Sequence, residues 1–161
     1  MVNDVIKVRI AKLSDLKNIQ ELNSMLFIKE IKEFDSTLNP DWTFSVNGTK
    51  YFSEAINSSN SCVLVSVFKN KIIGYLLGSI QDIESYRKIS KIAEIENMLV
   101  LDEFRGKNIG SKLINEFMKW CNNKKVTRLK VVASAMNNKA INFYKKHGFK
   151  DYSLTLEKDL I

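Results

Sequence analysis

The chain contains 161 residues, of which 45% are hydrophobic and 27% charged, with only six glycines and one proline. This composition predicts one folded domain over residues 1–161, and it excludes a largely disordered or low-complexity protein. The formal net charge is +7. The lysines are scattered, however, and no recognition helix or aromatic platform accompanies them, so we expect no nucleic acid partner.

The chain shows no targeting or membrane-spanning pattern. No apolar run approaches the ~20 residues that a membrane span requires, and residues 1–11 alternate charged and apolar side chains instead of forming a signal peptide. Cys62 and Cys121 lie in apolar stretches without the spacing of metal ligands, which favours buried free thiols over a disulfide or a zinc site. We therefore expect a cytoplasmic protein with no membrane partner and no bound metal.

The first half of the chain predicts a strand and two helices. Residues 5–10 alternate as a strand, and Ser14 and Asp15 are typical of the N-cap of a long helix. A shorter helix is expected over residues 51–56. The connection between the two helices, Glu33–Lys50, is unusually long, and it fits either a packed surface loop whose tryptophan (Trp42) fills the edge of the core or a substrate-binding lid.

The second half predicts strands and helices in alternation, which is the pattern of an α/β domain. Apolar or alternating runs indicate the strands, and a four-residue recurrence of Ile109, Leu113 and Phe117 indicates the helix that follows the central strand. The expected strands span residues 62–68, 72–80, 92–101, 128–133 and 149–160, and the expected late helix spans residues 137–147.

A basic, glycine-containing turn follows the central strand. It has the sequence Arg105-Gly106-Lys107-Asn108-Ile109-Gly110 and leads directly into a helix. Glycines let a ligand approach the backbone, the first-turn N–H groups lack intrahelical partners, and the helix dipole places partial positive charge there. With the two basic side chains added, the turn predicts a phosphate site, although its spacing is that of neither a P-loop nor a dinucleotide fold.

This turn resembles the Gln/Arg-x-x-Gly-x-Gly/Ala motif of the GCN5-related N-acetyltransferases (GNAT), which cradles the pyrophosphate of acetyl-coenzyme A. Asn108 stands where the motif has a glycine. Because asparagine enters the left-handed region readily, we expect the turn to keep its shape. Residues 137–149 match a second motif of the family, Asn-x-x-Ala-x-x-Phe/Leu-Tyr-x-x-x-Gly-Phe, at every fixed position. With both motifs in the family's order and separation, the chain is identified as a member of this superfamily.

The resemblance implies a mixed central sheet of about six to seven strands flanked by about four helices. It implies acetyl-coenzyme A as co-substrate, with the pantetheine arm paired to the main chain of the central strand and the pyrophosphate held by N–H groups of the turn. Arg105 would brace this turn; a surface arginine without such a role is the alternative. The implied cofactor-binding residues are Met98, Leu99, Val100, Arg105, Gly106, Lys107, Asn108, Ile109, Gly110, Ser111, Asn137 and Tyr144.

The candidate bases are Glu94 and Glu96, which stand two residues apart in the central strand and should therefore share one face. The resemblance places them at the two positions where family members carry a general base. We prefer Glu94, because its neighbours resemble the base-bearing segment of histone-acetylating members. The alternative for either glutamate is a surface ion pair with Lys88 or Lys91.

The resemblance places Tyr144 near the cofactor sulfur, where its O–H would protonate the leaving thiolate; a tyrosine that only packs in the core is the alternative. The predicted function is direct transfer of acetyl from acetyl-coenzyme A to a primary amine, which could belong to a small amine, an aminoglycoside, a polyamine or a protein. A non-catalytic acyl-coenzyme A sensor with the same fold is the alternative function. The closing strand would also allow a homodimer.

Overall fold

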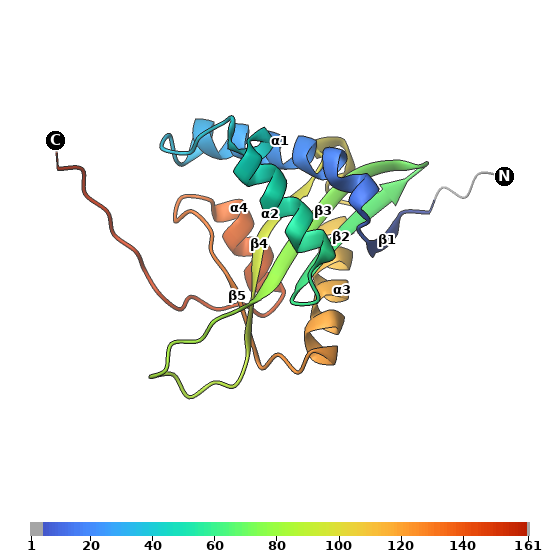
Figure 1. Ribbon diagram of the computed structural model, residues 1–161. Coiled ribbons are helices and arrows are strands. Elements are labelled where there is room, and N and C mark those ends of the chain that lie inside the picture. Colours follow the sequence, from blue (N-terminus) through green and yellow to red (C-terminus); the bar gives the residue numbers. More distant parts are fainter. Residues whose placement is uncertain (1–4, 161) are drawn as a thin grey trace.

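Strand alternation and helical periodicity produce most of the predicted elements in the predicted order (Figure 1). The computed structural model describes residues 5–160. The helices are α1 (Leu16–Glu33), α2 (Val46–Asn57), α3 (Ile109–Asn123) and α4 (Asn138–Lys146). The strands are β1 (Lys7–Ile10), β2 (Ser61–Phe68), β3 (Lys71–Gln81), β4 (Ile92–Val100) and β5 (Arg128–Val131), and the short 3-10 helices are η1 (Leu13–Asp15), η2 (Trp42–Phe44) and η3 (Asp102–Phe104). None of the helices in the described part of the chain is both long and apolar enough to cross a membrane.

The five described strands form one mixed sheet in the order β1-β2-β3-β4-β5. Strands β1 to β4 are antiparallel neighbours, whereas β5 runs parallel to β4. Strand β5 pairs only with the beginning of β4, from Ile92 opposite Arg128 to Ile95 opposite Val131. The remainder of β4, up to Val100, is therefore bonded to β3 on one side and to no strand of residues 5–160 on the other.

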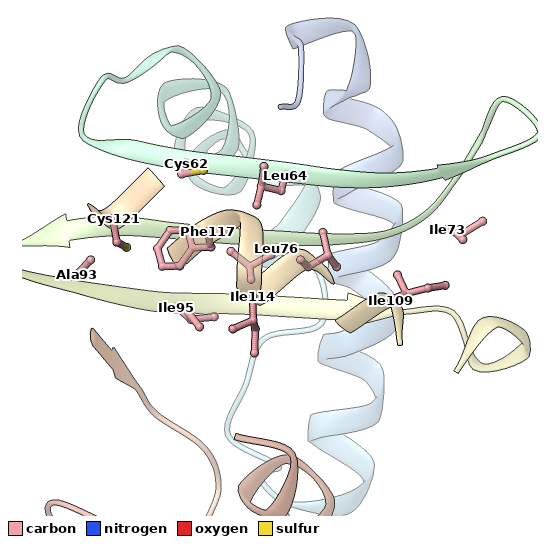
Figure 2. Packing of buried hydrophobic residues seen from close by; sticks show 11 residues of the cluster. Cys62, Leu64, Ile73, Leu76, Ala93, Ile95, Ile109, Ile114, Phe117 and Cys121 are labelled. Atoms are coloured by element: carbon pink, nitrogen blue, oxygen red, sulfur yellow. The ribbon is translucent and has the colours of Figure 1, made fainter. Parts of the chain in front are cut away.

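The sheet separates two hydrophobic clusters. One lies under α1 and α2, and the other lies under α3, where Ile114 and Phe117 pack against the strands (Figure 2). Gly78 permits this packing, because a Cβ atom there would lie 2.4 Å from Cζ of Phe117. Cys62 and Cys121 are buried free thiols in the α3 cluster, as predicted. Burial raises the pKa of Cys62 to about 12 and that of Cys121 to about 11.

The predicted closing strand over residues 149–160 is wrong, so the described sheet has five strands instead of six to seven. An alternating pattern produces a strand only where a sheet edge and an apolar surface receive it, and β5 offers an edge of only four residues. The segment instead leaves the body of the domain in an extended path (Figure 1), and Leu154, Leu156 and Leu160 are 73%, 84% and 90% exposed.

The connection before α2 is shorter than predicted, because α2 begins at Val46 and not near residue 51. The Ser45 hydroxyl caps the helix by accepting a hydrogen bond from the Gly48 N–H at 3.1 Å. Trp42 stacks on Phe27 of α1 with ring centroids 5.7 Å apart and lies against the α1–α2 cluster. This packing supports the first interpretation of Glu33–Lys50, in which Trp42 fills the edge of the core.

Candidate active site

A β-bulge lies where β4 carries its polar residues. The register of β3 against β4 shifts between Leu77 and Gly78, which leaves Glu96 as the extra residue of β4. A bulge re-aims side chains that a regular strand would send to opposite faces. Consequently Glu96 and Asn97, although consecutive, both hydrogen-bond to Tyr51 of α2.

Three neutral groups hold the Glu96 carboxylate. The Tyr51 hydroxyl donates to Oε2, the Ser79 hydroxyl donates to Oε1, and Nε2 of Gln81 donates to Oε1 at 3.3 Å. Ser79 is also the register partner of Glu94 in the β3–β4 ladder. Cross-strand partners share a face, so both glutamates lie on the side of the sheet that faces α1 and α2, which confirms that part of the prediction.

Glu94 forms an ion pair, but with a different lysine from the two that the sequence suggested. Its Oε2 atom lies 2.8 Å from Nζ of Lys130, which stands directly opposite in the β4–β5 ladder. Lys91 instead donates to the carbonyl of Lys124 at 2.9 Å, and the described chain contains no ion pair between Glu94 and Lys88. Lys91 precedes β4 and is engaged with Lys124, whereas a cross-strand neighbour lies within reach of Glu94.

The turn after η3 has the left-handed conformations that its motif requires. Asn108 has φ of 59° and lies in the left-handed region, which confirms the expectation that it can replace the motif glycine. Gly106 has φ of 73°. Asn108 is the N-cap of α3 and its side chain makes no capping hydrogen bond, so the first-turn N–H groups of α3 are left for an outside acceptor.

Arg105, at the start of this turn, contacts residues that precede it. Its Nε donates to the carbonyl of Val100 at 3.1 Å, and its Nη2 lies 2.6 Å from the Asp102 carboxylate. The guanidinium therefore ties the end of β4 to the start of the turn. The Lys107 ammonium lies over the Phe104 ring, 5.1 Å from its centroid.

Helices α3 and α4 meet closely behind the turn. Gly110 makes this possible, because a Cβ atom there would lie 2.9 Å from Cζ of Phe143 in α4. His147 joins the two helices through Nε2, 3.0 Å from the Ser111 hydroxyl, and through Nδ1, 2.9 Å from the Phe143 carbonyl. Asn137 caps α4 by accepting from the Ala140 N–H at 3.1 Å.

Tyr144 projects from α4 and is half-buried, with its ring edge-on to those of Phe143 and Phe149. Burial raises its pKa to about 12. The pKa of Tyr75 is also raised, first by burial and additionally by the nearby Tyr144. Tyr75 in turn donates to Asn97 of β4 at 3.1 Å.

A cavity of about 520 Å³ lies beside β5, and a larger one of about 760 Å³ lies at the end of β4. The larger cavity falls in the size range of small-molecule sites. It joins α1, the free end of β4, the turn and the start of α4, and thus borders three predicted cofactor residues. Its lining includes Leu22, Met25, Lys29, Leu99, Val100, Arg105 and Lys139.

Residues 28–149 match the family model described as the acetyltransferase (GNAT) family, which covers more than half of the chain. The chain belongs to the GNAT family. Its fold is shared with solved structures of low sequence identity. A mutant of the BH1408 protein from Bacillus halodurans has a TM-score of 0.79 at 22% identity, and the match covers 96% of this chain and 99% of that one.

Two further structural neighbours are aminoglycoside acetyltransferases. AAC(6')-Iy in complex with CoA has a TM-score of 0.74 at 16% identity, and the match covers 95% of this chain and 98% of that one. The acetyltransferase meta-AAC0020 from an uncultured soil metagenomic sample, in complex with sisomicin, has a TM-score of 0.70 at 21% identity, with 97% of both chains covered. At these identities the likeness concerns the fold alone.

Most of the predicted site residues of the GNAT domain lie on β4 or in the turn that follows it, and Asn137 and Tyr144 lie at α4. Both glutamates lie on the α1–α2 side of β4, whereas Tyr144 packs against the cluster under α3. In the described chain Asn137 acts as a helix cap and Ser111 as a partner of His147. Within residues 5–160, no group of three or more histidine, cysteine or acidic side chains is placed to hold a metal.

Sequence reasoning missed the groups that hold Glu96 in this GNAT domain. Tyr51, Ser79 and Gln81 come from α2 and β3 and carry no motif of their own. One signal was present in α1, where Gln20 and Asn23 interrupt the apolar face and are both buried. Polar side chains on a buried helix face require hydrogen-bond partners, so they indicate an internal polar network.

Proposed function

We propose that this GNAT domain transfers the acetyl group of acetyl-coenzyme A to a primary amine. The observation that carries the proposal is the parting of β4 from β5 after Ile95, beside a left-handed turn at the N-terminus of α3. This arrangement provides a free strand edge and a phosphate-binding helix end next to each other. Both are needed to hold a long molecule that has an amide-containing arm and a pyrophosphate.

The residues present fit acetyl-coenzyme A. The main-chain groups of Met98, Leu99 and Val100 on the free side of β4 would pair with the pantetheine amides, and the N–H groups of residues 107–111 would hold the pyrophosphate. Asn137, at the start of α4, would contact the cofactor from the other side of the gap. When bound, acetyl-coenzyme A supplies a thioester whose acetyl group is transferred and whose sulfur leaves as a thiolate.

Tyr144 is the proposed general acid. With a pKa of about 12 its phenol stays protonated at neutral pH, so it is always available as a hydrogen-bond donor. A free thiol has a pKa of about 8.5, and complete proton transfer from such a phenol would therefore be uphill by several pK units. The role that fits this environment is a hydrogen bond that stabilises charge on the leaving sulfur and delivers the proton as the thiol forms.

The proposed acceptor is a primary amine in its cationic form. An alkylamine with a pKa of about 10.4 is neutral to only about one part in 10³ at pH 7, so it must lose a proton before it attacks. Glu94 and Glu96 share the face beside α1 and α2 and are the candidate bases, acting directly or through water. An aminoglycoside, on which the two acetyltransferase neighbours act by name, is one candidate acceptor, together with small amines, polyamines and protein amines.

The test is release of free coenzyme A thiol from acetyl-coenzyme A in the presence of a panel of these amines. We expect at least one amine to raise the rate clearly above hydrolysis, with the acetylated amine confirmed by mass spectrometry. If acetyl-coenzyme A raises the melting temperature but no amine accelerates thiol release, the domain is instead an acyl-coenzyme A sensor. We propose a cytoplasmic location, which the two buried free cysteines support.

A further inference from the structure

A chain of hydrogen bonds crosses the domain from η2 to Glu96. Its members come from η2, α1, α2, β3 and β4, and each is bonded to the next. In order, the Thr43 hydroxyl donates to Asn23 Oδ1 (2.7 Å), Asn23 Nδ2 to the Tyr75 hydroxyl (3.0 Å), Tyr75 to Asn97 Oδ1 (3.1 Å), Asn97 Nδ2 to the Tyr51 hydroxyl (3.2 Å), and Tyr51 to Glu96 Oε2.

The carboxylate at one end dictates the direction of every bond in this chain. An ionised Glu96 can only accept, so Tyr51 must donate to it and must use its oxygen to accept from the Asn97 amide nitrogen. The Asn97 carbonyl then faces Tyr75, which donates in turn. The Asn23 amide nitrogen donates to the Tyr75 hydroxyl, so the Asn23 carbonyl oxygen is left to accept from Thr43, which is the first donor. All five bonds therefore point toward Glu96, and bonds aligned in this way polarise one another.

The chain is buried and anchored, which makes it rigid. Asn23, Thr43 and Tyr75 are each 0% exposed. At its far end, Nε2 of Gln20 donates to the Thr43 carbonyl at 2.9 Å. Burial raises the pKa of Tyr51, with the charge of Glu96 and their hydrogen bond adding to the rise, so its hydroxyl remains a donor throughout the working pH range.

The two glutamates differ in charge balance. Glu94 is paired with Lys130, whereas the described chain provides Glu96 with neutral donors only. A carboxylate held in this way, without a cation, is complementary to a positively charged acceptor. The titratable groups that these contacts bring together around Glu96 and Glu94 are Tyr51, Tyr75 and Lys130.

We propose that Tyr51 is a positioning residue, which fixes Glu96 as the group that binds the acceptor ammonium and receives its proton. The inference rests on the proposed acetyltransferase function and assigns the base role to Glu96 in place of the preferred Glu94. In this step an N–H bond of the ammonium breaks, the proton passes to a Glu96 oxygen, and the electron pair stays on nitrogen for attack. Tyr51 holds Oε2, so the proton arrives on a carboxylate of fixed orientation.

The test compares Tyr51→Phe, Glu96→Gln, Glu94→Gln and the double variant Tyr51→Phe/Glu96→Gln on an amine that the wild type acetylates. Phenylalanine keeps the ring that packs on Trp42 and Phe52, with centroids 5.5 and 4.9 Å away, and removes only the hydroxyl. The matched control is Tyr86→Phe, because Tyr86 is 82% exposed and belongs to the loop before β4.

We expect Tyr51→Phe to lower kcat/KM about tenfold or more at pH 7, as for loss of a hydrogen bond to a charged group. The loss should shrink as pH rises and more of the amine is neutral. Glu96→Gln should show the same pH signature and a larger loss, the double variant should lose no more than Glu96→Gln alone, and Tyr86→Phe should match the wild type.

The proposal is overturned if the losses of the two single variants multiply in the double variant, if the Tyr51→Phe loss is independent of pH, or if only Glu94→Gln shows the pH rescue. Should Tyr51→Phe fail to fold by circular dichroism, Ser79→Ala removes another donor to Glu96 and takes its place in the same cycle. A wild type that binds acetyl-coenzyme A but acetylates no amine contradicts the proposed function itself, which separates the two failures.

Discussion

Replacing Asn108 tests whether the left-handed turn is what prepares the phosphate site. Asn108 has φ of 59° and makes no side-chain capping bond, so Asn108→Ala removes only the tolerance of asparagine for this conformation. The left-handed region costs an ordinary residue about 1–2 kcal/mol, so we expect the free energy of unfolding to fall by about 1 kcal/mol. For a chain of this length that corresponds to a decrease in melting temperature of about 2–4 °C. Asn108→Gly should stay within about 0.5 kcal/mol of the wild type, since the relief of strain offsets the extra entropy of the unfolded chain.

The matched control is Asn115→Ala, which makes the same substitution at an exposed right-handed position of the same helix, where alanine is at least as favourable as asparagine. Titration calorimetry with acetyl-coenzyme A should then show an affinity up to about fivefold weaker for Asn108→Ala, because part of its population leaves the binding conformation. Equal melting temperatures and equal affinities for the two alanine variants would refute the argument that the turn is held in this conformation for the ligand.

Three other predictions concern chemistry, assembly and pH. Tyr144→Phe should lower kcat more than it lowers acetyl-coenzyme A affinity. Because the pKa of Tyr144 is about 12, its deprotonation should not reduce the wild-type rate below about pH 11. If residues 153–161 complete the β5 edge of a second copy, light scattering should show a homodimer that becomes a monomer when they are deleted. Hydrogen bonding from Arg9 lowers the pKa of Asp15, so Asp15→Asn should cost stability at pH 7 and progressively less as pH falls below about 4, measured by urea unfolding at both pH values.

The features that the sequence predicted correctly are those fixed by local chemistry. The left-handed Asn108 and the helix that begins at Ile109 both depend on residues within a few positions of one another. The features that it missed depend on register between strands. The partner of Glu94 is Lys130 because β5 lies beside β4 with these residues opposed, and nothing in the neighbourhood of Glu94 along the chain contains that information.

The closing segment, residues 149–160, shows a second limit of prediction from sequence. Alternation at Tyr152, Leu154 and Leu156 describes a chain that is able to join a sheet, but the sheet must also present an edge to receive it. Tyr152 is instead held by Arg87, which donates to its hydroxyl at 2.9 Å, and by Arg128, which stacks 4.8 Å from its ring centroid. Pattern alone therefore predicts the potential for pairing and not the pairing itself.

Both parts of the proposed site depend on the β-bulge in β4. The bulge at Glu96 follows immediately after Ile95, the last residue of β4 that pairs with β5. A bulge bends its strand and increases the local twist. The same extra residue accounts for two features: β4 turns away from β5, and Glu96 and Asn97 both hydrogen-bond to Tyr51. In the proposed function the first feature frees the edge for the cofactor and the second builds the acceptor side. Both features therefore depend on the position of this one extra residue in β4.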